Sequence, residues 1–247
     1  MEERTQGIVL RKVRYNDTGV IVDIFTASRG TVSFMAKTGK GGRLKAPLLA
    51  PLAMVEVGFR WRQQRPLQQL DEVQTAFPYS SLGTDPLKTT LAMFLQEFLY
   101  HVLKNEVANE PLYRFVEQSM RWLDREDDGL ANFHLTFMMR LTHYLGLWPC
   151  TEDWHEGCYF DLNDGVMTDT MPPHRFWLSA NDTARIPLIT RMNYRSMRLF
   201  RMNRAQRNFI LDCLLAYYRL HVPEFPELRQ VEVLREIFCP APPTSGK

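Results

Sequence analysis

The sequence lacks several features that would assign the protein to a particular compartment or class. Its four cysteines are widely scattered and form no C-x-x-C pair, which fits a reducing compartment better than a disulfide framework. No apolar run near the start is long enough to cross a bilayer, and the opening residues MEERTQG lack the apolar core of a signal peptide. These absences predict a cytoplasmic protein with no membrane span.

The common catalytic and nucleotide-binding motifs are also missing. Gly39 and Lys40 are followed by Gly41 rather than by the Ser or Thr of a P-loop, and no G-x-G-x-x-G, G-x-S-x-G or H-E-x-x-H occurs. The histidines in the helical region are interpreted as helix-face residues, and the acidic run 124–128 as a solvated loop. The sequence therefore predicts no enzyme and no cofactor. A hydrolase whose catalytic triad is dispersed along the chain is the least favoured interpretation of its function.

Metal-ligating residue types gather in one stretch but without the spacing of a structural zinc site. Cys150 and Cys158 have seven residues between them, and no second cysteine pair follows, although His155 and His174 lie in the same region. Structural zinc sites combine two close ligand pairs. We therefore predict no metal site here.

Acidic residues are absent between Asp23 and Glu56, and this gap is part of a wider segregation of charge. Residues 1–65 hold 12 Lys and Arg against 5 Asp and Glu, and residues 183–247 hold 11 against 5. The segment 66–182 between them is acidic. A concentrated positive field attracts polyanions even when the net charge is only +2. The alternative is that basic and acidic faces neutralise each other inside the molecule.

The first 80 residues show the alternating pattern of β-strands. The clearest case is 53–62, where apolar residues alternate with Glu56, Arg60 and Arg62. Five short strands with turn signals between them are typical of an OB-type barrel. The predicted strands are 7–15, 19–26, 31–37, 53–62 and 66–77.

After Pro78 the apolar spacing becomes helical. Helices are predicted at 86–104, 111–123, 130–147 and from Asn203, where Asn203 and Gln206 match a capping box, to Pro223. The pattern thus predicts an α+β protein with an OB-fold barrel at 1–80 and an all-α helical domain at 81–240. Within the second domain we expect an irregular excursion at about 148–184, and after it a disordered tail at 241–247.

A barrel with outward cations suits nucleic acid, because Lys and Arg neutralise phosphates while bases stack on aromatic rings. Tyr15, Phe34 and Trp61 are candidates for stacking, but the alternation places Phe34 and Trp61 on the core side. The glycine-rich stretch 36–45 lets the backbone approach a polyanion closely. The predicted DNA-binding residues are Arg11, Lys12, Arg14, Lys37, Lys40, Arg43, Lys45, Arg60 and Arg62, with the basic segment 191–207 as a further possibility.

Several short motifs occur in a fixed order along the chain. The N-terminal ones are Gly7-Ile8-Val9-Leu10, Tyr15-Asn16-Asp17, Thr26 to Gly30, Ala36-Lys37 to Arg43, and Leu49-Ala50-Pro51. A helix end at Leu145-Gly146 and the closing stretch 217–234 follow. Together, in this order and spacing, they resemble the RecO family of DNA repair and recombination mediators, and the likeness spans nearly the whole chain.

This resemblance implies an OB-fold followed by a helical domain. It also implies that the protein binds single- and double-stranded DNA and anneals complementary strands. It also implies partnership with RecR, binding to the acidic tail of the single-stranded DNA-binding protein, and assistance in loading RecA. Two features depart from the family. Thr38 follows the loop lysine where the family has glycine, and only Cys150 and Cys158 remain of a four-cysteine zinc module found in some members.

Binding of an acidic tail with an aromatic end requires a hydrophobic pocket with a cation at its rim. Arg121 and Arg140 are the helical cations of the acidic middle that lie nearest large apolar residues, so either is a candidate for the tail carboxylates. An alternative to DNA binding is a protein-interaction adaptor whose basic barrel binds an acidic partner.

Overall fold

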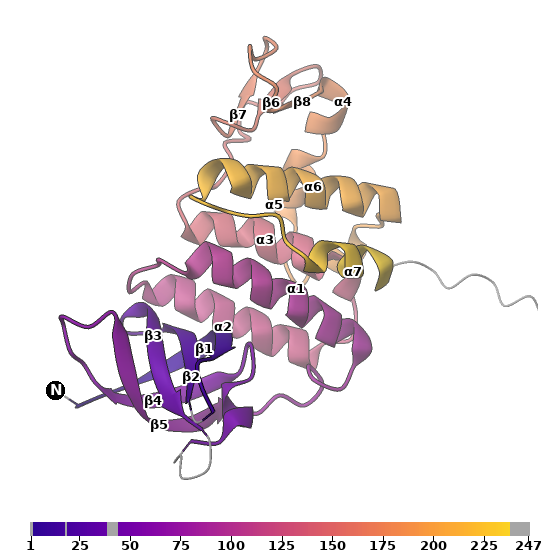
Figure 1. Ribbon diagram of the computed structural model, residues 1–247. Helices are drawn as coiled ribbons and strands as arrows, with labels where there is room; N and C mark the ends of the chain where they lie inside the picture. The colour runs from indigo at the N-terminus through magenta and orange to yellow at the C-terminus, as the bar shows by residue number, and fades with distance from the viewer. Residues whose placement is uncertain (1, 18, 39–43, 238–247) are drawn as a thin grey trace, which may run out of the picture. The chain divides into compact units, whose positions relative to one another are not determined.

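The computed structural model describes residues 2–17, 19–38 and 44–237 (Figure 1). The first part is a closed barrel with strand order β1-β2-β3-β5-β4, in which β4 pairs back onto β1. This is the strand order of an OB-fold, so the predicted fold class is confirmed. Its strands are β1 (Glu2–Arg14), β2 (Gly19–Thr26), β3 (Gly30–Lys37), β4 (Met54–Arg60) and β5 (Leu67–Phe77).

The barrel forms because the inward positions of each strand are apolar. Alternate residues of β3 are buried, and Phe34 meets Phe59 of β4 edge to face with ring centroids 5.0 Å apart. All strand pairs are antiparallel except β3 with β5, where Ser33–Met35 run alongside Leu67–Gln69. The side chain of Met35, on the outer face, is therefore next to Gln69.

Two helices belong to the same compact unit as the barrel, which comprises residues 1–125. Helix α1 (Pro86–Leu103) begins after Asp85, whose side chain accepts a hydrogen bond from the Lys88 backbone N–H. The Thr31 hydroxyl of β3 donates to the carbonyl of Leu103 at 2.6 Å. Helix α2 (Glu110–Arg125) places Tyr113 against Phe25 of β2, with centroids 5.8 Å apart. The packing unit therefore extends well past residue 80.

A buried carboxylate ties the end of α2 to the connection between barrel and helices. Asp124 is only 3% exposed and accepts backbone hydrogen bonds from Ser80, Ser81 and Leu82 at 2.8–3.0 Å. The ammonium of Lys88, also buried, donates to the Asp124 carbonyl at 3.0 Å. The sequence interpretation of 124–128 as a solvated loop is wrong for Asp124, because three backbone donors converge on its side chain.

The second compact unit, residues 126–247, is built on α3 (Phe133–Tyr144) and α6 (Arg204–His221). The Tyr218 hydroxyl of α6 donates to the carbonyl of Met138 in α3 at 2.8 Å. The capping box predicted at Asn203 and Gln206 is confirmed at the start of α6. A further helix, α7 (Gln230–Ile237), was not predicted.

The stretch predicted as irregular contains a small antiparallel sheet. Its strands are β6 (Tyr159–Asp161), β7 (Val166–Thr168) and β8 (Trp177–Leu178), followed by the short helices α4 (Ala180–Thr183) and α5 (Ile186–Arg191). The expectation of irregular structure at 148–184 is therefore wrong for the three strands and α4, which are two to four residues long and too short for a period to emerge. Across the described ranges, no helix combines the length and apolar character needed to cross a membrane.

Candidate nucleic-acid interface

The barrel holds both ends of the glycine-rich stretch 36–45, which we call the basic loop. Lys37 ends β3 with an exposed side chain, and its carbonyl accepts the backbone N–H of Leu44 at 3.4 Å. Leu44 is buried in the barrel core, and Lys45 beside it is exposed. The hydrogen bond between Lys37 and Leu44 thus holds the two ends of this stretch together at the barrel. Lys40 and Arg43 lie outside the described residues.

Two open grooves lie along β5, and Gln69 lines both of them. One contains Lys37 and Arg60, and the other is lined by Met35, Arg62 and Arg65. The amide of Gln69 donates to the Met35 carbonyl at 3.1 Å, so this residue bridges β3 and β5 where the grooves meet. The structure therefore brings Lys37, Arg60 and Arg62 of the predicted set onto one surface.

Arg65 belongs to this surface and was missed by the sequence analysis. It lies on the β4–β5 connection, where the Gln68 amide donates to its carbonyl and to that of Arg62. The run RWRQQR at 60–65 was the signal that could have identified it. We call Lys37, Arg60, Arg62, Arg65 and Gln69 the β5 surface.

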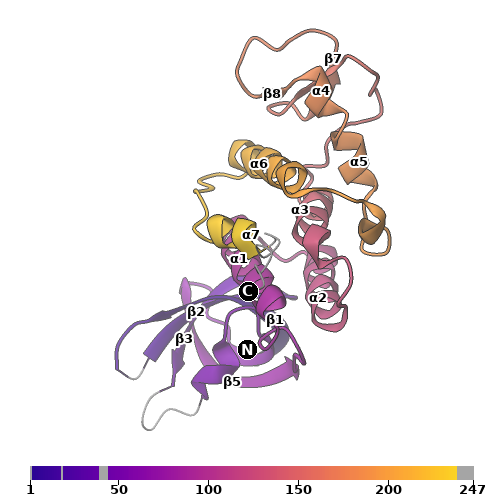
Figure 2. The same ribbon diagram turned by 90° about the vertical axis from the view of Figure 1, so that its right-hand side faces the viewer.

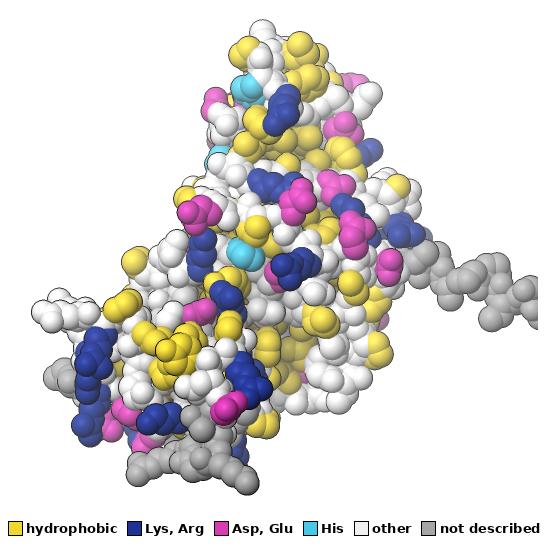
Figure 3. Space-filling model, viewed as in Figure 1, with side chains coloured by type: hydrophobic (Ala, Val, Ile, Leu, Met, Phe, Trp, Pro, Cys, Tyr) yellow, Lys and Arg dark blue, Asp and Glu magenta, His cyan; other side chains and the backbone are white. Residues whose placement is uncertain are grey.

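Acidic side chains border one side of this surface. Asp71 and Glu72 of β5 line the groove that holds Lys37, and Glu72 forms an ion pair with Arg4 at 2.5 Å. Figure 3 shows dark-blue and magenta side chains intermixed over the barrel. A polyanion is therefore expected to run from Lys37 across Gln69 to Arg62 and Arg65, whose groove has no acidic lining residue.

The three cations of β1 are placed differently. Arg11 stacks on the ring of Tyr100 in α1, 4.8 Å from its centroid, and hydrogen-bonds to the Tyr100 hydroxyl. Arg14 forms an exposed ion pair with Asp17 at 2.7 Å. Lys12 is exposed. Contacts within the first unit thus already engage Arg11 and Arg14.

Of the aromatic candidates, Tyr15 alone has a largely free side chain, 63% exposed. Phe34 is fully buried. Trp61 packs edge to face against Phe59, and the guanidinium of Arg29 lies 4.1 Å from its ring centroid. The expectation that Phe34 and Trp61 serve the core holds.

The two arginines proposed for tail binding lie in different units. Arg121 pairs with Glu117 at 2.7 Å and lies over the ring of Phe77. Arg140 donates from Nε to the Met192 carbonyl at 3.0 Å and lies 5.7 Å from the Trp148 ring centroid. Arg140 adjoins a pocket of the second unit through Met192, which is one of the lining residues of that pocket.

That pocket was not predicted. It has a volume of about 170 Å³, room for one or two side chains, and Arg185 and Arg201 lie among its lining residues. The sequence clue was a mixture of arginines and large apolar residues between 185 and 206. The apolar lining consists of Leu188, Ile189, Met192, Phe200, Met202 and Ile210.

The candidate zinc ligands have separate partners. His174 hydrogen-bonds to Asp161 at 3.2 Å, and His155 pairs with Asp169 at 2.9 Å. Cys158 is buried and Cys150 is exposed. Among the described residues, no three side chains of the usual ligand types are grouped for a metal.

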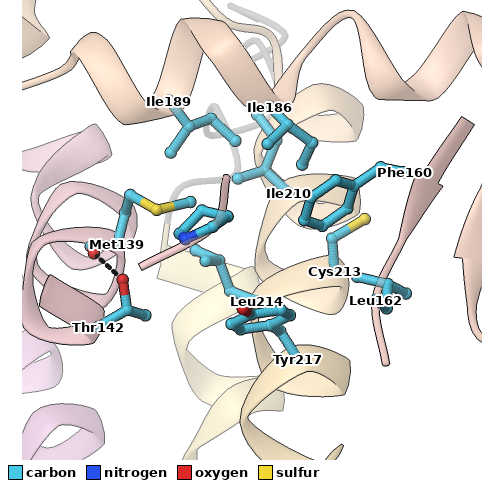
Figure 4. Close-up of a pocket in the computed structure, with 11 residues that line it drawn as sticks. Met139, Thr142, Phe160, Leu162, Ile186, Ile189, Ile210, Cys213, Leu214 and Tyr217 are labelled. Atoms are coloured by element: carbon cyan, nitrogen blue, oxygen red, sulfur yellow. Dashed lines mark hydrogen bonds between the residues drawn. The ribbon is translucent and has the colours of Figure 1, made fainter. Parts of the chain in front are cut away.

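Another pocket in the second unit is lined mainly by apolar side chains, with Thr142, Tyr217 and the thiol of Cys213 among them (Figure 4). Its volume is about 20 Å³, enough for little more than one water. Burial raises the pKa of Cys213 to about 12, so its thiol is neutral at pH 7. His134 of α3 is buried as well, and burial lowers its pKa to about 3, so it is uncharged. Neither group is poised as a nucleophile or a base.

Known proteins match this chain along almost its whole length. The family model for the N-terminal part of recombination protein O matches residues 1–79, and that for the C-terminal part matches residues 83–229. A DNA repair protein RecO of Phocaeicola vulgatus is 42% identical over 240 residues, covering 96% of this chain and 100% of its own. Proteins of the same name from Bacteroides fragilis and Porphyromonas gingivalis are 39% and 33% identical, covering 96% and 95% of this chain and 100% and 98% of their own. With its closed OB barrel and helical region, the chain belongs to the recombination protein O family of DNA repair and recombination.

Proposed function

We propose that this protein is a non-enzymatic mediator of recombinational repair that binds single- and double-stranded DNA and anneals complementary strands. One observation carries the proposal: the β5 surface gathers four cations on the outside of a closed OB barrel. The β4–β5 connection, which holds Arg62 and Arg65, is a loop that OB-folds use to contact oligonucleotides. The proposed place of action is the cytoplasm.

The chemistry of the β5 surface favours contact with phosphates rather than reading of bases. Arginine presents a planar fork that can bind phosphate oxygens in pairs, while lysine provides a point charge. Contacts of this kind position a strand without reading its sequence. Binding should therefore be similar across base sequences, with Tyr15 available to stack on one base.

A salt titration of single-stranded DNA binding tests this proposal. The test variant is Lys37→Ala/Arg62→Ala/Arg65→Ala, and the control Lys104→Ala/Arg114→Ala/Arg125→Ala removes the same charge elsewhere in the first unit. Each lost phosphate contact removes a slope of about 0.7 from the log–log salt plot, so the test variant should be flatter by about 2. A companion variant, Lys40→Ala/Arg43→Ala, measures the contribution of these two cations of the basic loop to DNA binding in the same assay. Unchanged affinity and slope in the test variant would refute the proposed site.

The adaptor alternative gives a different result in the same assay. A basic barrel that recognises an acidic protein should bind poly-glutamate as tightly as an oligonucleotide of equal charge. We expect the oligonucleotide to bind more tightly, because its bases can also stack on the exposed ring of Tyr15, whereas poly-glutamate offers only its charge.

We further propose that the protein acts with RecR and with the acidic tail of the single-stranded DNA-binding protein, and so helps to load RecA. The pocket beside Arg140 supports tail binding, since it combines apolar walls with the guanidinium groups of Arg185 and Arg201. Arg140 would act by positioning Met192 rather than by reaching the tail itself. If an Arg185→Ala/Arg201→Ala variant binds a tail peptide as well as the parent, the tail must dock elsewhere, with Arg121 as the remaining candidate.

A further inference from the structure

A second basic surface lies on the 126–247 unit and plays no part in the barrel site. Between Asp182 and Asp212 the sequence has seven arginines, no lysine and no acid. Five of them are exposed, and the first four of these lie at the end of α5 or in the segment that joins α5 to α6 (Figure 2). We call Arg191, Arg195, Arg198 and Arg201 the arginine row.

No ion pair found among residues 126–237 neutralises the positive charge of the row. Of the ion pairs found in residues 44–237, that of Arg185 with Asp182 is the one nearest in sequence, and none includes a member of the row. The acidic residues 126–128 are near in space, since a Cβ at Gly129 would lie 3.3 Å from the Cβ of Arg198, yet none of the ion pairs found joins Arg198 to them. Four uncompensated guanidinium groups in one short segment create a local field that favours an anionic partner.

The backbone that carries the row is anchored to the core. The amide of the buried Asn132 donates to the carbonyls of Met197 and Phe200, both at 2.9 Å. Tyr194 stacks on Phe133 at a centroid distance of 5.3 Å, and the side chain of Met197 is fully buried. The arginines therefore project from a backbone that is already ordered, so binding loses less conformational entropy than it would on a flexible tail.

An Asn side chain completes this anchoring. The Asn193 Oδ1 accepts the backbone N–H groups of Arg195 and Ser196, both at 3.0 Å. The turn that separates Arg195 from Arg198 is thus held locally as well as from the core. Because the inward residues satisfy the packing, the arginines are not needed to stabilise the segment.

We infer that the arginine row binds the phosphate backbone of a second DNA strand, so that one chain can hold a strand on each of its two units. This inference rests on the proposed function, because it assigns the first strand to the β5 surface. The planar fork of arginine binds two oxygens of one phosphate at once, so four exposed arginines along one segment suit a phosphate backbone. Neutralising both strands removes the charge repulsion that slows the pairing of complementary single strands.

The row also differs from the nearby apolar pocket in what it can bind. Arg201 lines that pocket, whereas Arg191, Arg195 and Arg198 do not. An acidic peptide seated in the pocket would therefore use Arg185 and Arg201. A longer polyanion is needed to engage the remaining three arginines, which favours DNA over a peptide tail.

The test compares two variants that remove equal charge from the same unit. Arg195→Ala/Arg198→Ala changes the row, and Arg175→Ala/Arg219→Ala changes exposed arginines elsewhere. Both pairs of arginines have exposed side chains, so both variants should fold, as circular dichroism can verify. The first readout is the annealing rate of two complementary labelled oligonucleotides. The second is the number of oligonucleotides bound per chain at low salt.

We expect the row variant to anneal about tenfold more slowly than the parent, because the charges that attract the second strand are lost. It should bind one oligonucleotide per chain where the parent binds two, with first-strand affinity unchanged within about twofold. Annealing at the parent rate with two oligonucleotides bound would overturn the inference. So would normal annealing combined with loss of an acidic peptide, which would assign the row to a protein partner.

The barrel variant Lys37→Ala/Arg62→Ala/Arg65→Ala separates this inference from the proposed function. Failure of the proposed function appears as unchanged first-strand affinity in the barrel variant. Failure of the present inference appears as unchanged annealing in the row variant. The two outcomes are independent of each other.

Discussion

At the scale of single residues, the most consequential side chain outside the binding surfaces is Asp124. Burial alone would raise the pKa of its carboxyl, but backbone hydrogen bonds from Ser80, Ser81 and Leu82 and the Ser80 hydroxyl outweigh burial and lower the pKa to about 2. The carboxylate thus takes the place that an anion would occupy among converging N–H groups. Its role is to fix the turn through which the barrel continues into α1.

We predict that Asp124→Ala lowers the free energy of unfolding by about 3 kcal/mol at pH 7, because it leaves buried backbone donors without an acceptor. The stabilisation comes from a carboxyl whose pKa is lower in the folded than in the unfolded protein. It is therefore fully present above about pH 4 and lost as the pH falls towards 2. Urea unfolding of parent and variant at pH 7 and pH 3 measures this, and an equal difference at both values would contradict the assignment.

At the scale of elements, the first unit depends on a close approach between the β2–β3 turn and the α1–α2 connection. Gly30 has φ +72°, and a Cβ built there would lie 2.1 Å from the Glu106 carbonyl oxygen and 2.4 Å from the Val107 carbonyl carbon. The next residue, Thr31, donates its N–H to the same Glu106 carbonyl at 2.9 Å. Backbone meets backbone here, so no side chain can yield to make room.

Gly30→Ala should therefore destabilise the protein by more than about 2 kcal/mol, since the left-handed conformation and the clash both oppose it. Gly83→Ala is the matched control, because a Cβ at Gly83 meets nothing within 4 Å. Thermal unfolding followed by circular dichroism should show a lower Tm for Gly30→Ala and a nearly unchanged one for Gly83→Ala. Equal melting of the two variants would argue against a tight contact at Gly30.

At the scale of the whole molecule, the sequence pattern and the packing of the structure divide the chain at different residues. The sequence pattern predicts a domain at 1–80, whereas the compact unit extends to residue 125. The apolar residues Leu10 and Phe25 are completely buried, and the carbonyl of Leu10 accepts a hydrogen bond from Gln96 of α1. A chain that ends at residue 80 lacks α1 and α2 and so exposes this side of the barrel.

We predict that a 1–125 fragment folds cooperatively and keeps the salt-dependent DNA binding of the β5 surface, while a 1–80 fragment aggregates or unfolds. Urea unfolding and gel filtration of the two fragments distinguish these outcomes. A stable, monomeric 1–80 fragment would show that the barrel does not need its two helices and would favour the boundary predicted from the sequence.

The sequence by itself determined the strands, the main helices and the family. Period-2 alternation in 53–62 and the apolar spacing of 86–104 survive in any environment, because they report which side of an element is buried. The capping box at Asn203 is equally local. The cations of the basic loop and of β4 were also visible, since charge is a property of the residue and not of the fold.

Only the tertiary structure decided which of those cations share a surface. Lys37 and Arg62 are 25 positions apart, and the parallel pairing of β3 with β5 places the strand that carries Lys37 beside Gln69, which lines the same groove as Arg62. The same holds for Asp124, whose three donors lie more than 40 residues earlier in the sequence. Burial of a charge depends on distant backbone groups that converge on it. No local pattern encodes such convergence, so an acid read as solvated in the sequence becomes a structural anchor in the fold.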